Sequence, residues 1–246
     1  MGRLVRAASG RFSGVLSDIQ LEVARLVAGL PEAADFALAG GAALIVRGDV
    51  DRGTRDLDFF GLDAESVDRL VPAAEGALRD AGFEVERILQ HSGFTRLMVT
   101  RGDDATELDL ATDARLLPIE QGPGFPVLSG EELAADKVLA VFGRAEARDY
   151  VDLMAVERRF GLERLFELAL AKDPGFSPAV FVDMLDRFPR LRRDEFPIDD
   201  GQFDELQWRV GIWRSGALEI GRTGEGGVDR AHDLQRDRTR GHGLDP

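Results

Sequence analysis

The segment covering residues 36–60 constrains the fold of this chain more than any other part of the sequence. An apolar run leads into Gly40 and Gly41, and a second apolar segment, residues 42–46, follows the glycines. A polar stretch then precedes the sequence Asp-Leu-Asp-Phe-Phe at residues 56–60. This order predicts a strand, a glycine turn, a short helix, a loop and a second strand.

The glycine pair and the aspartate pair each suggest a ligand. Neighbouring glycines let the backbone approach a bound group closely, and a helix that begins beside them points unpaired N–H groups at a phosphate. Residues two apart on a strand lie on one side, roughly 6–7 Å apart, so Asp56 and Asp58 project together while Leu57 and Phe59 face the core. Carboxylate oxygens of this kind suit Mg²⁺. Either pattern alone is also typical of an ordinary turn or a solvated strand end, so the interpretation depends on their order and spacing.

With the sequences AGGAAL and TRDLDFF, this segment resembles the start of the nucleotidyltransferase fold of the DNA polymerase β superfamily. In detail it is similar to the AbiEii/AbiGii toxin-like family. The resemblance implies an α+β fold, in which a core with a mixed sheet flanked by helices precedes a helical C-terminal lobe. It also implies that Gly40, Gly41 and Ala42 lie at the nucleotide, together with Arg47 or Arg55. The family often has Ser or Thr where this chain has Ala42, so one hydroxyl donor to the triphosphate is missing.

A third carboxylate is expected from the segment TELDLATD, residues 106–113. On a strand, Leu108 and Leu110 share one face, and Glu107 and Asp109 share the other. Polymerase β-like enzymes have a third aspartate on a strand that neighbours the first pair, and we assign this position to Asp109. Glu107 could equally point inward, and a plain solvated face is the alternative to both.

Lysine is rare in this chain: of 31 basic residues, only Lys137 and Lys172 are lysines. A lysine retained where arginine is otherwise used suggests a need for a compact ammonium group. The resemblance extends to a lysine on a helix followed by an Arg-Asp-x-x-Asp-Leu helix, here Arg148 to Leu153. By that resemblance Lys137 and Arg148 contact the nucleotide phosphates, and Asp152 orients Lys137 or acts near the base. The alternative is that Arg148 and Asp152 form an ordinary i,i+4 helix ion pair.

The remaining pattern predicts the order of elements along the chain. Helices are expected at residues 15–30, 63–82 (with Pro72 as a kink or break), 129–142, 146–159, 162–172, 178–188 and 202–214. Strands are expected at residues 83–90, 94–100 and 106–112, with hairpin turns between them.

A Pro- and Gly-rich connector, residues 118–126, predicts the boundary between the two parts of the chain. We therefore expect a nucleotidyltransferase core at residues 1–118 and a helical lobe at residues 119–215. A polar, Gly-rich tail at residues 216–246 is expected to be disordered.

Composition narrows the function. The chain has no cysteine, which favours a cytoplasmic location. It has no apolar run close to the roughly 20 residues that a membrane span needs. Its start lacks the apolar core of a signal peptide. The net charge of −14 opposes nonspecific binding of nucleic acid. A local basic run could still contact RNA phosphates, and its arginines are Arg187, Arg190, Arg192 and Arg193.

The resemblance implies a Mg²⁺-dependent enzyme that transfers a nucleoside monophosphate from an NTP to an acceptor hydroxyl. Asp56, Asp58 and Asp109 would hold two metal ions, with Asp109 also helping to deprotonate the acceptor. Some family members are toxins of toxin–antitoxin pairs and some modify tRNA, so tRNA and a cognate antitoxin are the expected partners. Two alternatives remain: transfer to a small molecule such as an aminoglycoside, and a catalytically degenerate nucleotide-binding module.

Overall fold

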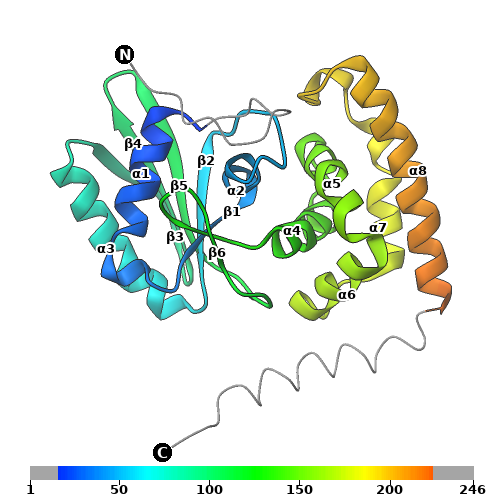
Figure 1. Cartoon of the computed structure of the whole chain (residues 1–246), viewed down its shortest axis with the longest axis horizontal. Helices are drawn as coiled ribbons and strands as arrows, with labels where there is room; N and C mark the ends of the chain where they lie inside the picture. The colour runs from blue at the N-terminus through cyan, green and yellow to red at the C-terminus, as the bar shows by residue number, and fades with distance from the viewer. Residues whose placement is uncertain (1–15, 224–246) are drawn as a thin grey trace, which may run out of the picture. The chain divides into compact units, whose positions relative to one another are not determined.

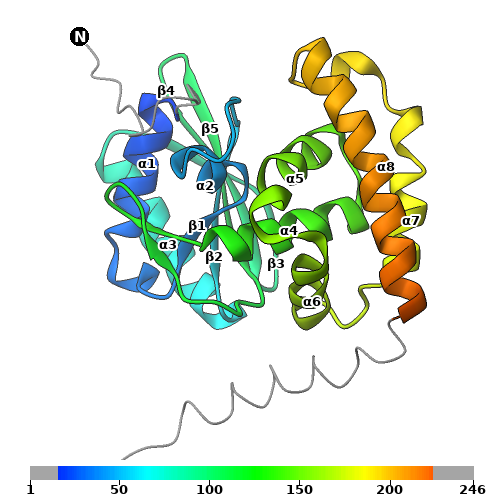
Figure 2. The ribbon, with the colours of Figure 1, turned by 45° about the vertical axis from the view of Figure 1, so that its right-hand side comes forward.

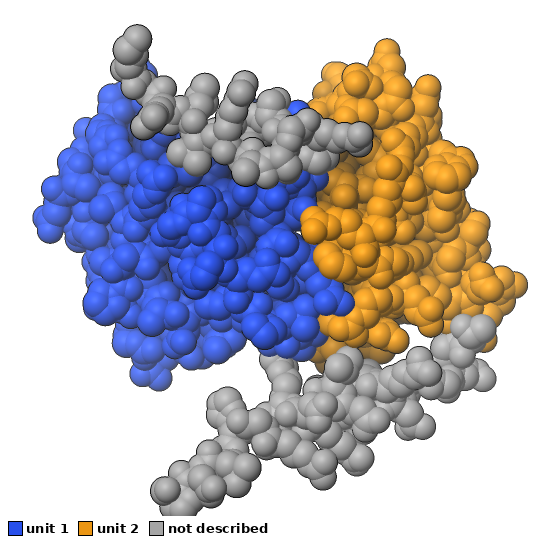
Figure 3. Space-filling view, in the orientation of Figure 1, with its two compact units in different colours: residues 1–133 blue, residues 134–246 orange. Residues whose placement is uncertain are grey.

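The computed structural model describes residues 16–223. The chain divides into two compact units, residues 1–133 (unit 1) and residues 134–246 (unit 2), which are coloured separately in Figure 3. The division falls within one helix, α4 (Gly130–Gly143). Each unit has its own arrangement of elements and is described by itself.

Unit 1 is built on one seven-stranded sheet (Figure 1). Its strands are β1 (Ala37–Ala39), β2 (Asp56–Gly61), β3 (Glu84–His91), β4 (Phe94–Arg101), β5 (Asp104–Thr112), β6 (Glu120–Gln121) and β7 (Pro126–Val127). Across the sheet they follow the order β3-β4-β5-β2-β1-β7-β6. The sheet is mixed, because β2 runs parallel to β5 but antiparallel to β1. The expected mixed sheet and the two expected hairpins are therefore confirmed.

Helices flank this sheet. They are α1 (Asp18–Ala28), the 3-10 turn η1 (Pro31–Ala33), α2 (Gly40–Val46) and α3 (Ala64–Asp80). Figures 1 and 2 show α1 and α3 side by side on one face of the sheet. The expected elements of the 36–60 segment are all present, with the glycine pair forming the first turn of α2. The α3 helix runs through Pro72 without a break, so the break considered at that residue is wrong.

Local sequence explains where these helices begin. At α1 the hydroxyl of Ser17 accepts the N–H of Gln20, and the side chain of Gln20 accepts the N–H of Ser17. This reciprocal capping satisfies two donors that a helix N-terminus leaves unpaired. At α3 the carboxylate of Asp63 accepts the N–H of Ser66 in the same way. Both caps lie directly before the apolar periodicity that predicts each helix.

Unit 2 is helical, as expected. Its elements are α4, α5 (Ala147–Phe160), α6 (Leu162–Lys172), α7 (Pro178–Leu185), the 3-10 turns η2 (Phe188–Arg190) and η3 (Arg193–Glu195), and α8 (Asp200–Thr223). Aromatic rings fill its core: Phe166 contacts Phe176 and Phe181 with ring centroids 5.0 Å apart in each case. Offset and edge-on ring pairs of this kind add to the free energy gained from burial alone.

The boundary expected after residue 118 differs from the division found between the units. The connector contains β6 and β7, and Leu38 of β1 pairs in parallel with Val127 of β7. These short strands extend the sheet of unit 1, so the connector belongs with the core. The capping expected at Ser129 is present, because its hydroxyl accepts the N–H of Glu132 at 3.2 Å.

The C-terminal helix is longer than expected. Residues 202–214 were expected to be helical, whereas α8 continues to Thr223. The expectation of disorder is therefore wrong for residues 216–223, where Ala217 is buried and holds the helix against unit 2. Residues 224–246 lie outside the described part of the chain. Within residues 16–223, no helix has the length and apolarity that crossing a membrane requires.

Tyr150 gives a test of the packing in unit 2. Its buried hydroxyl donates to the backbone carbonyl of Met184 at 2.8 Å, and burial raises the pKa of this phenol. We expect Tyr150→Phe to lower the free energy of unfolding by about 1–2 kcal/mol, because the buried carbonyl loses its donor. Both tryptophans, Trp208 and Trp213, lie on α8, so urea unfolding followed by tryptophan fluorescence reports on unit 2.

The matched control is Ser215→Ala, which removes an exposed hydroxyl that also donates to a backbone carbonyl, that of Gly211. It should change stability little, because water replaces the lost partner. Equal effects of the two substitutions would contradict the buried role of Tyr150.

Candidate active site

The glycine pair supports the aspartate pair directly. Gly40 has a φ of +59°, a left-handed conformation that residues with a side chain rarely adopt. A Cβ atom at Gly40 would lie 1.9 Å from Oδ2 of Asp58, so the carboxylate of Asp58 occupies the space of a side chain. Both features require glycine at this position. The group that approaches the backbone of Gly40 closely is thus a side chain of the protein itself, the carboxylate of Asp58.

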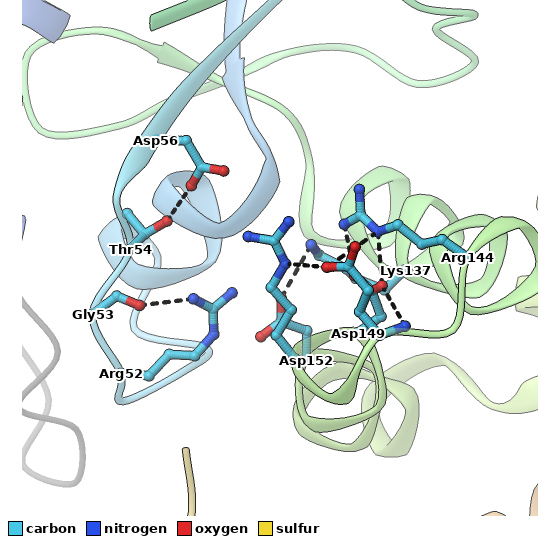
Figure 4. Close-up of polar contacts among 10 residues, drawn as sticks. Arg52, Gly53, Thr54, Asp56, Lys137, Arg144, Asp149 and Asp152 are labelled. Carbon is cyan, nitrogen blue, oxygen red and sulfur yellow. Dashed lines mark hydrogen bonds and ion pairs between the residues drawn. The ribbon is translucent and has the colours of Figure 1, made fainter. Parts of the chain in front are cut away.

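Gly41 faces a different pair of side chains. A Cβ there would lie 2.8 Å from Nη2 of Arg52 and 3.2 Å from Oγ1 of Thr54. The Thr54 hydroxyl donates to Oδ1 of Asp56 at 2.5 Å, and Nη1 of Arg52 donates to the carbonyl of Gly53 at 2.8 Å (Figure 4). Arg52 therefore places a guanidinium group beside the glycine backbone, and Thr54 orients the first aspartate.

Sequence reasoning did not select Arg52. It lies in the same polar loop as Arg47 and Arg55, and nothing in the sequence ranked these three arginines. In the structure Arg47 donates to the carboxylates of Asp49, at 3.1 Å, and of Glu120. Arg55 is exposed. Arg52 thus differs from Arg47 and Arg55 in lying beside Gly41. Only the fold reveals this position.

Ala42 is fully buried. Its methyl group packs in the interior, and a hydroxyl at this position would enter the same closed space. The absence of Ser or Thr at residue 42 is therefore a change at a buried position of unit 1. The degenerate nucleotide-binding module stays an alternative prediction.

The third carboxylate is aligned with the first pair by strand register. In the parallel pairing of β2 with β5, Asp56 is level with Glu107 and Asp58 is level with Asp109. Asp109 is 5% exposed, whereas Glu107 is half-buried. Two pairs of carboxylates thus lie at neighbouring positions on β2 and β5. Of the two candidates on β5, Asp109 is the more buried.

A basic side chain from β4 lies against this acidic group. Arg96 pairs with Asp109 in the β4–β5 ladder. Its Nε donates to Oδ1 of Asp109 at 2.7 Å and its Nη2 donates to Oδ2 at 2.6 Å. Nη1 of Arg96 also lies 3.3 Å from Glu107. The hydrogen bonds to Asp109 raise the pKa of the Arg96 guanidinium, against the opposing effect of burial, so Arg96 remains charged.

The carboxylates are suited to a hard divalent cation, since each offers oxygen donors alone. Asp56, Asp58 and Asp109 occupy neighbouring positions of the β2–β5 ladder. Their carboxylate oxygens do not all lie within 4.8 Å of one another. Both oxygens of Asp109 instead accept from Arg96. The residues fit a metal site, provided that Asp109 exchanges the guanidinium for the cation.

Unit 1 has a separate acidic pair, Asp113 and Glu132, whose carboxylate oxygens, unlike those of the β2 and β5 aspartates, do lie within 4.8 Å of each other. The oxygens of Glu132 accept the backbone N–H groups of Leu116 and Leu117, at 2.8 Å for the closest. The half-buried Arg115 lies in the electrostatic field of both acids. These contacts fasten the chain after β5 to the start of α4, which gives this acidic pair a structural role.

In unit 2, Lys137 and Asp152 form a buried ion pair. Nζ of Lys137 lies 3.0 Å from Oδ2 of Asp152, and their side chains are 8% and 0% exposed (Figure 4). Arg148 donates to Glu146 at 3.0 Å, both at the start of α5. The structure thus joins Lys137 to Asp152 within unit 2.

Asp149, which precedes Asp152 on α5, has an arginine partner. Asp149 is fully buried and accepts two hydrogen bonds from Arg144, each at 2.8 Å (Figure 4). The same carboxylate accepts the N–H of Glu146 at 3.2 Å, in a capping box at the start of α5. Asp149 therefore fixes the turn between α4 and α5, which positions Asp152 one helical turn further on.

The basic run of unit 2 is only partly available as a positive surface. Arg192 pairs with Asp194, and Arg193 lies 2.9 Å from Asp200. Arg187 and Arg190 are exposed. The charges of Arg192 and Arg193 are therefore partly offset by these acids.

Comparison with solved structures identifies the fold as that of a nucleotidyltransferase. The toxin MenT4 (Rv2826c) from Mycobacterium tuberculosis H37Rv matches with a TM-score of 0.57 and 20% identity, covering 87% of this chain and 97% of that one. JHP933 from Helicobacter pylori matches with a TM-score of 0.51 and 20% identity, covering 89% and 99%. A putative nucleotidyltransferase from H. pylori gives 0.51 and 19%, covering 84% and 98%.

The sequence itself identifies the family. The family model described as nucleotidyl transferase AbiEii toxin, type IV TA system, matches residues 25–209. The chain therefore belongs to the AbiEii family of nucleotidyltransferase toxins. No curated protein matches the chain at a significant level. The family resemblance read from the glycine and aspartate pairs is thus confirmed.

The buried pair in unit 2 can be tested by its effect on stability. We expect Asp152→Asn to lower the free energy of unfolding by about 3 kcal/mol, because the ammonium group of Lys137 is left buried without a countercharge. Arg148→Gln is the control, since it breaks the exposed pair with Glu146 and should cost less than about 1 kcal/mol. Urea titration of both variants measures the difference.

The double variant Lys137→Met/Asp152→Leu should recover part of the loss, because neither charge then remains buried. If Asp152→Asn costs no more than Arg148→Gln, the pair contributes nothing to the stability of unit 2.

Proposed function

We propose that this chain is a Mg²⁺-dependent nucleotidyltransferase that transfers a nucleoside monophosphate from an NTP to a hydroxyl of RNA, with tRNA as the expected acceptor. It would act in the cytoplasm as the toxin of a toxin–antitoxin pair. The observation that carries the proposal is the register of β2 with β5, which aligns Asp58 with Asp109 beside the backbone of Gly40. Membership of the AbiEii family supports the same activity.

In this proposal Asp56, Asp58 and Asp109 hold the magnesium ions. Bound magnesium would supply positive charge to the phosphates and to the attacking and leaving oxygens. The chain contributes the geometry: Thr54 fixes the orientation of Asp56 through its hydroxyl, and Gly40 leaves room for the carboxylate of Asp58. Most of the rate enhancement in such transfers comes from positioning and charge neutralisation.

The reaction can be written with these groups in named roles. The acceptor hydroxyl oxygen forms a bond to the α-phosphorus, the bond from that phosphorus to the bridging oxygen breaks, and pyrophosphate leaves. The hydroxyl proton passes to a carboxylate, for which Asp109 is our assignment. The guanidinium group of Arg52, beside Gly41, is the unit 1 cation that we assign to the triphosphate. The phosphate contacts that the resemblance assigns to Lys137 and Arg148 remain predictions.

The aspartates provide the direct test. We expect Asp56→Asn and Asp58→Asn each to reduce incorporation of labelled nucleotide by at least about a hundredfold, because each removes a charge that the transition state requires. Asp104→Asn, an exposed aspartate at the start of β5, is the matched control and should retain activity. Circular dichroism establishes that each variant is folded.

Activity that survives in folded Asp56→Asn and Asp58→Asn would reject the assignment of the site. Label that appears on a small molecule and never on RNA would leave the transfer reaction intact and replace its acceptor.

The acceptor can be tested through the two exposed arginines of unit 2. We expect Arg187→Glu/Arg190→Glu to reduce labelling of total RNA by about tenfold or more, because lost phosphate contacts weaken binding. The control is Arg69→Glu/Arg79→Glu on α3, which changes net charge equally at exposed positions of unit 1. Equal labelling by both double variants would show that this basic run does not contact the acceptor.

A further inference from the structure

One charged group on the acidic face of unit 1 has no place in the proposed reaction. Arg96 extends from β4, the strand beside β5, and contacts both β5 carboxylates: Asp109 through two hydrogen bonds and Glu107 at 3.3 Å. Its positive charge also acts on Asp56. A cation that the protein itself supplies thus lies where the proposed metal ligands meet.

We propose that Arg96 is an internal counter-cation that holds Asp109 in the metal-free enzyme and competes with the metal ion for it. Arg96 is then a positioning residue that determines when Asp109 becomes a metal ligand. This inference rests on the proposed function, because it requires Asp109 to be a ligand.

Electrostatics explains why such a group is needed. Asp109 is buried, and an ionised carboxylate without a partner in such a place is costly. Its neighbour in register, Asp58, carries the same charge, and like charges on adjacent strands destabilise the sheet. The two hydrogen bonds from Arg96 offset both effects, so the acidic face can fold before a metal binds.

The exchange must occur by movement of the arginine. The side chain of Asp109 is 6% exposed and is held in the middle of the sheet, whereas that of Arg96 is 36% exposed. Arg96 has the longer and more flexible side chain, and its charge can be solvated. Its guanidinium carbon also lies 5.9 Å from the ring centroid of Phe94 on the same strand, which offers an aromatic face outside the ion pair.

This arrangement predicts cooperation between metal and nucleotide. A metal ion alone must break the ion pair between Arg96 and Asp109, and the guanidinium group then gains only water. A triphosphate that binds with the metal supplies a new anionic partner for the released guanidinium. Each ligand should therefore raise the affinity for the other, since coupling between two bound groups is reciprocal.

The test compares Mn²⁺ affinity, measured by electron paramagnetic resonance without nucleotide, in the full chain and in Arg96→Gln. We expect the variant to bind Mn²⁺ about tenfold more tightly, the fold-change that corresponds to one charged hydrogen-bonded contact. Without metal, the same variant should melt at a lower temperature than the parent chain and gain more from added Mn²⁺. A non-hydrolysable NTP analogue should tighten Mn²⁺ binding more in the parent chain than in Arg96→Gln.

The matched control is Arg101→Gln. Arg101 lies on the same strand and also binds one carboxylate through two nitrogens, that of Glu22, away from the acidic face. It should leave Mn²⁺ affinity unchanged. If Arg96→Gln does not fold, Arg96→Lys replaces it: the lysine keeps the charge but cannot form the two parallel hydrogen bonds, so Mn²⁺ should bind more tightly than to the parent chain.

Unchanged or weaker Mn²⁺ binding in the Arg96 variant would overturn the inference, since Arg96 would then not compete with the metal. Asp58→Asn, made in both backgrounds, separates this outcome from failure of the proposed function. If Asp58→Asn weakens Mn²⁺ binding but Arg96→Gln does not tighten it, the metal site stands and only the role of Arg96 is rejected. If Asp58→Asn has no effect in either background, the metal site itself is rejected.

Discussion

The contact between a carboxylate and a glycine backbone is the constraint on which unit 1 depends. Asp58 can lie on the sheet face only because Gly40 has no side chain and adopts a φ of +59°. The same contact fixes the start of α2 against β2, and the parallel register of β2 with β5 then brings Asp109 level with Asp58. The turn and the carboxylate of Asp58 are thus fixed by one local contact, and the pairing of β2 with β5 adds Asp109 beside them.

Within residues 16–223, several enclosed charged side chains lie in ion pairs, although the chain carries a net charge of −14. Both of its lysines are buried: Lys137 binds Asp152 at 3.0 Å, and Lys172 binds Asp136. The compact ammonium group fits these enclosed pairs, which agrees with the retention of lysine at just these positions. At more exposed positions the partner of the carboxylate is an arginine, as Arg96 is for Asp109. Removing one partner of such a pair leaves an uncompensated buried charge, which is strongly destabilising.

The sequence by itself determined the class of fold and the position of the candidate site. Glycines followed by alternating aspartates and apolar residues dictate a turn and a half-buried strand, because both patterns act over a few residues. The helices of unit 2 followed from apolar periodicity for the same reason. The end of α8 was missed, since Ala217 is buried by packing that the glycines and charged residues around it do not indicate.

Only the tertiary structure decided which side chains meet. The choice between Glu107 and Asp109, left open by alternation along one strand, depends on register with β2 and on burial, which are long-range properties. The position of Arg52 beside Gly41, and the hydrogen bonds from Arg96 to Asp109, likewise depend on neighbours distant in sequence. Spacing shows which face a residue occupies, but the partner across that face is set by how strands pair and how closely their backbones approach.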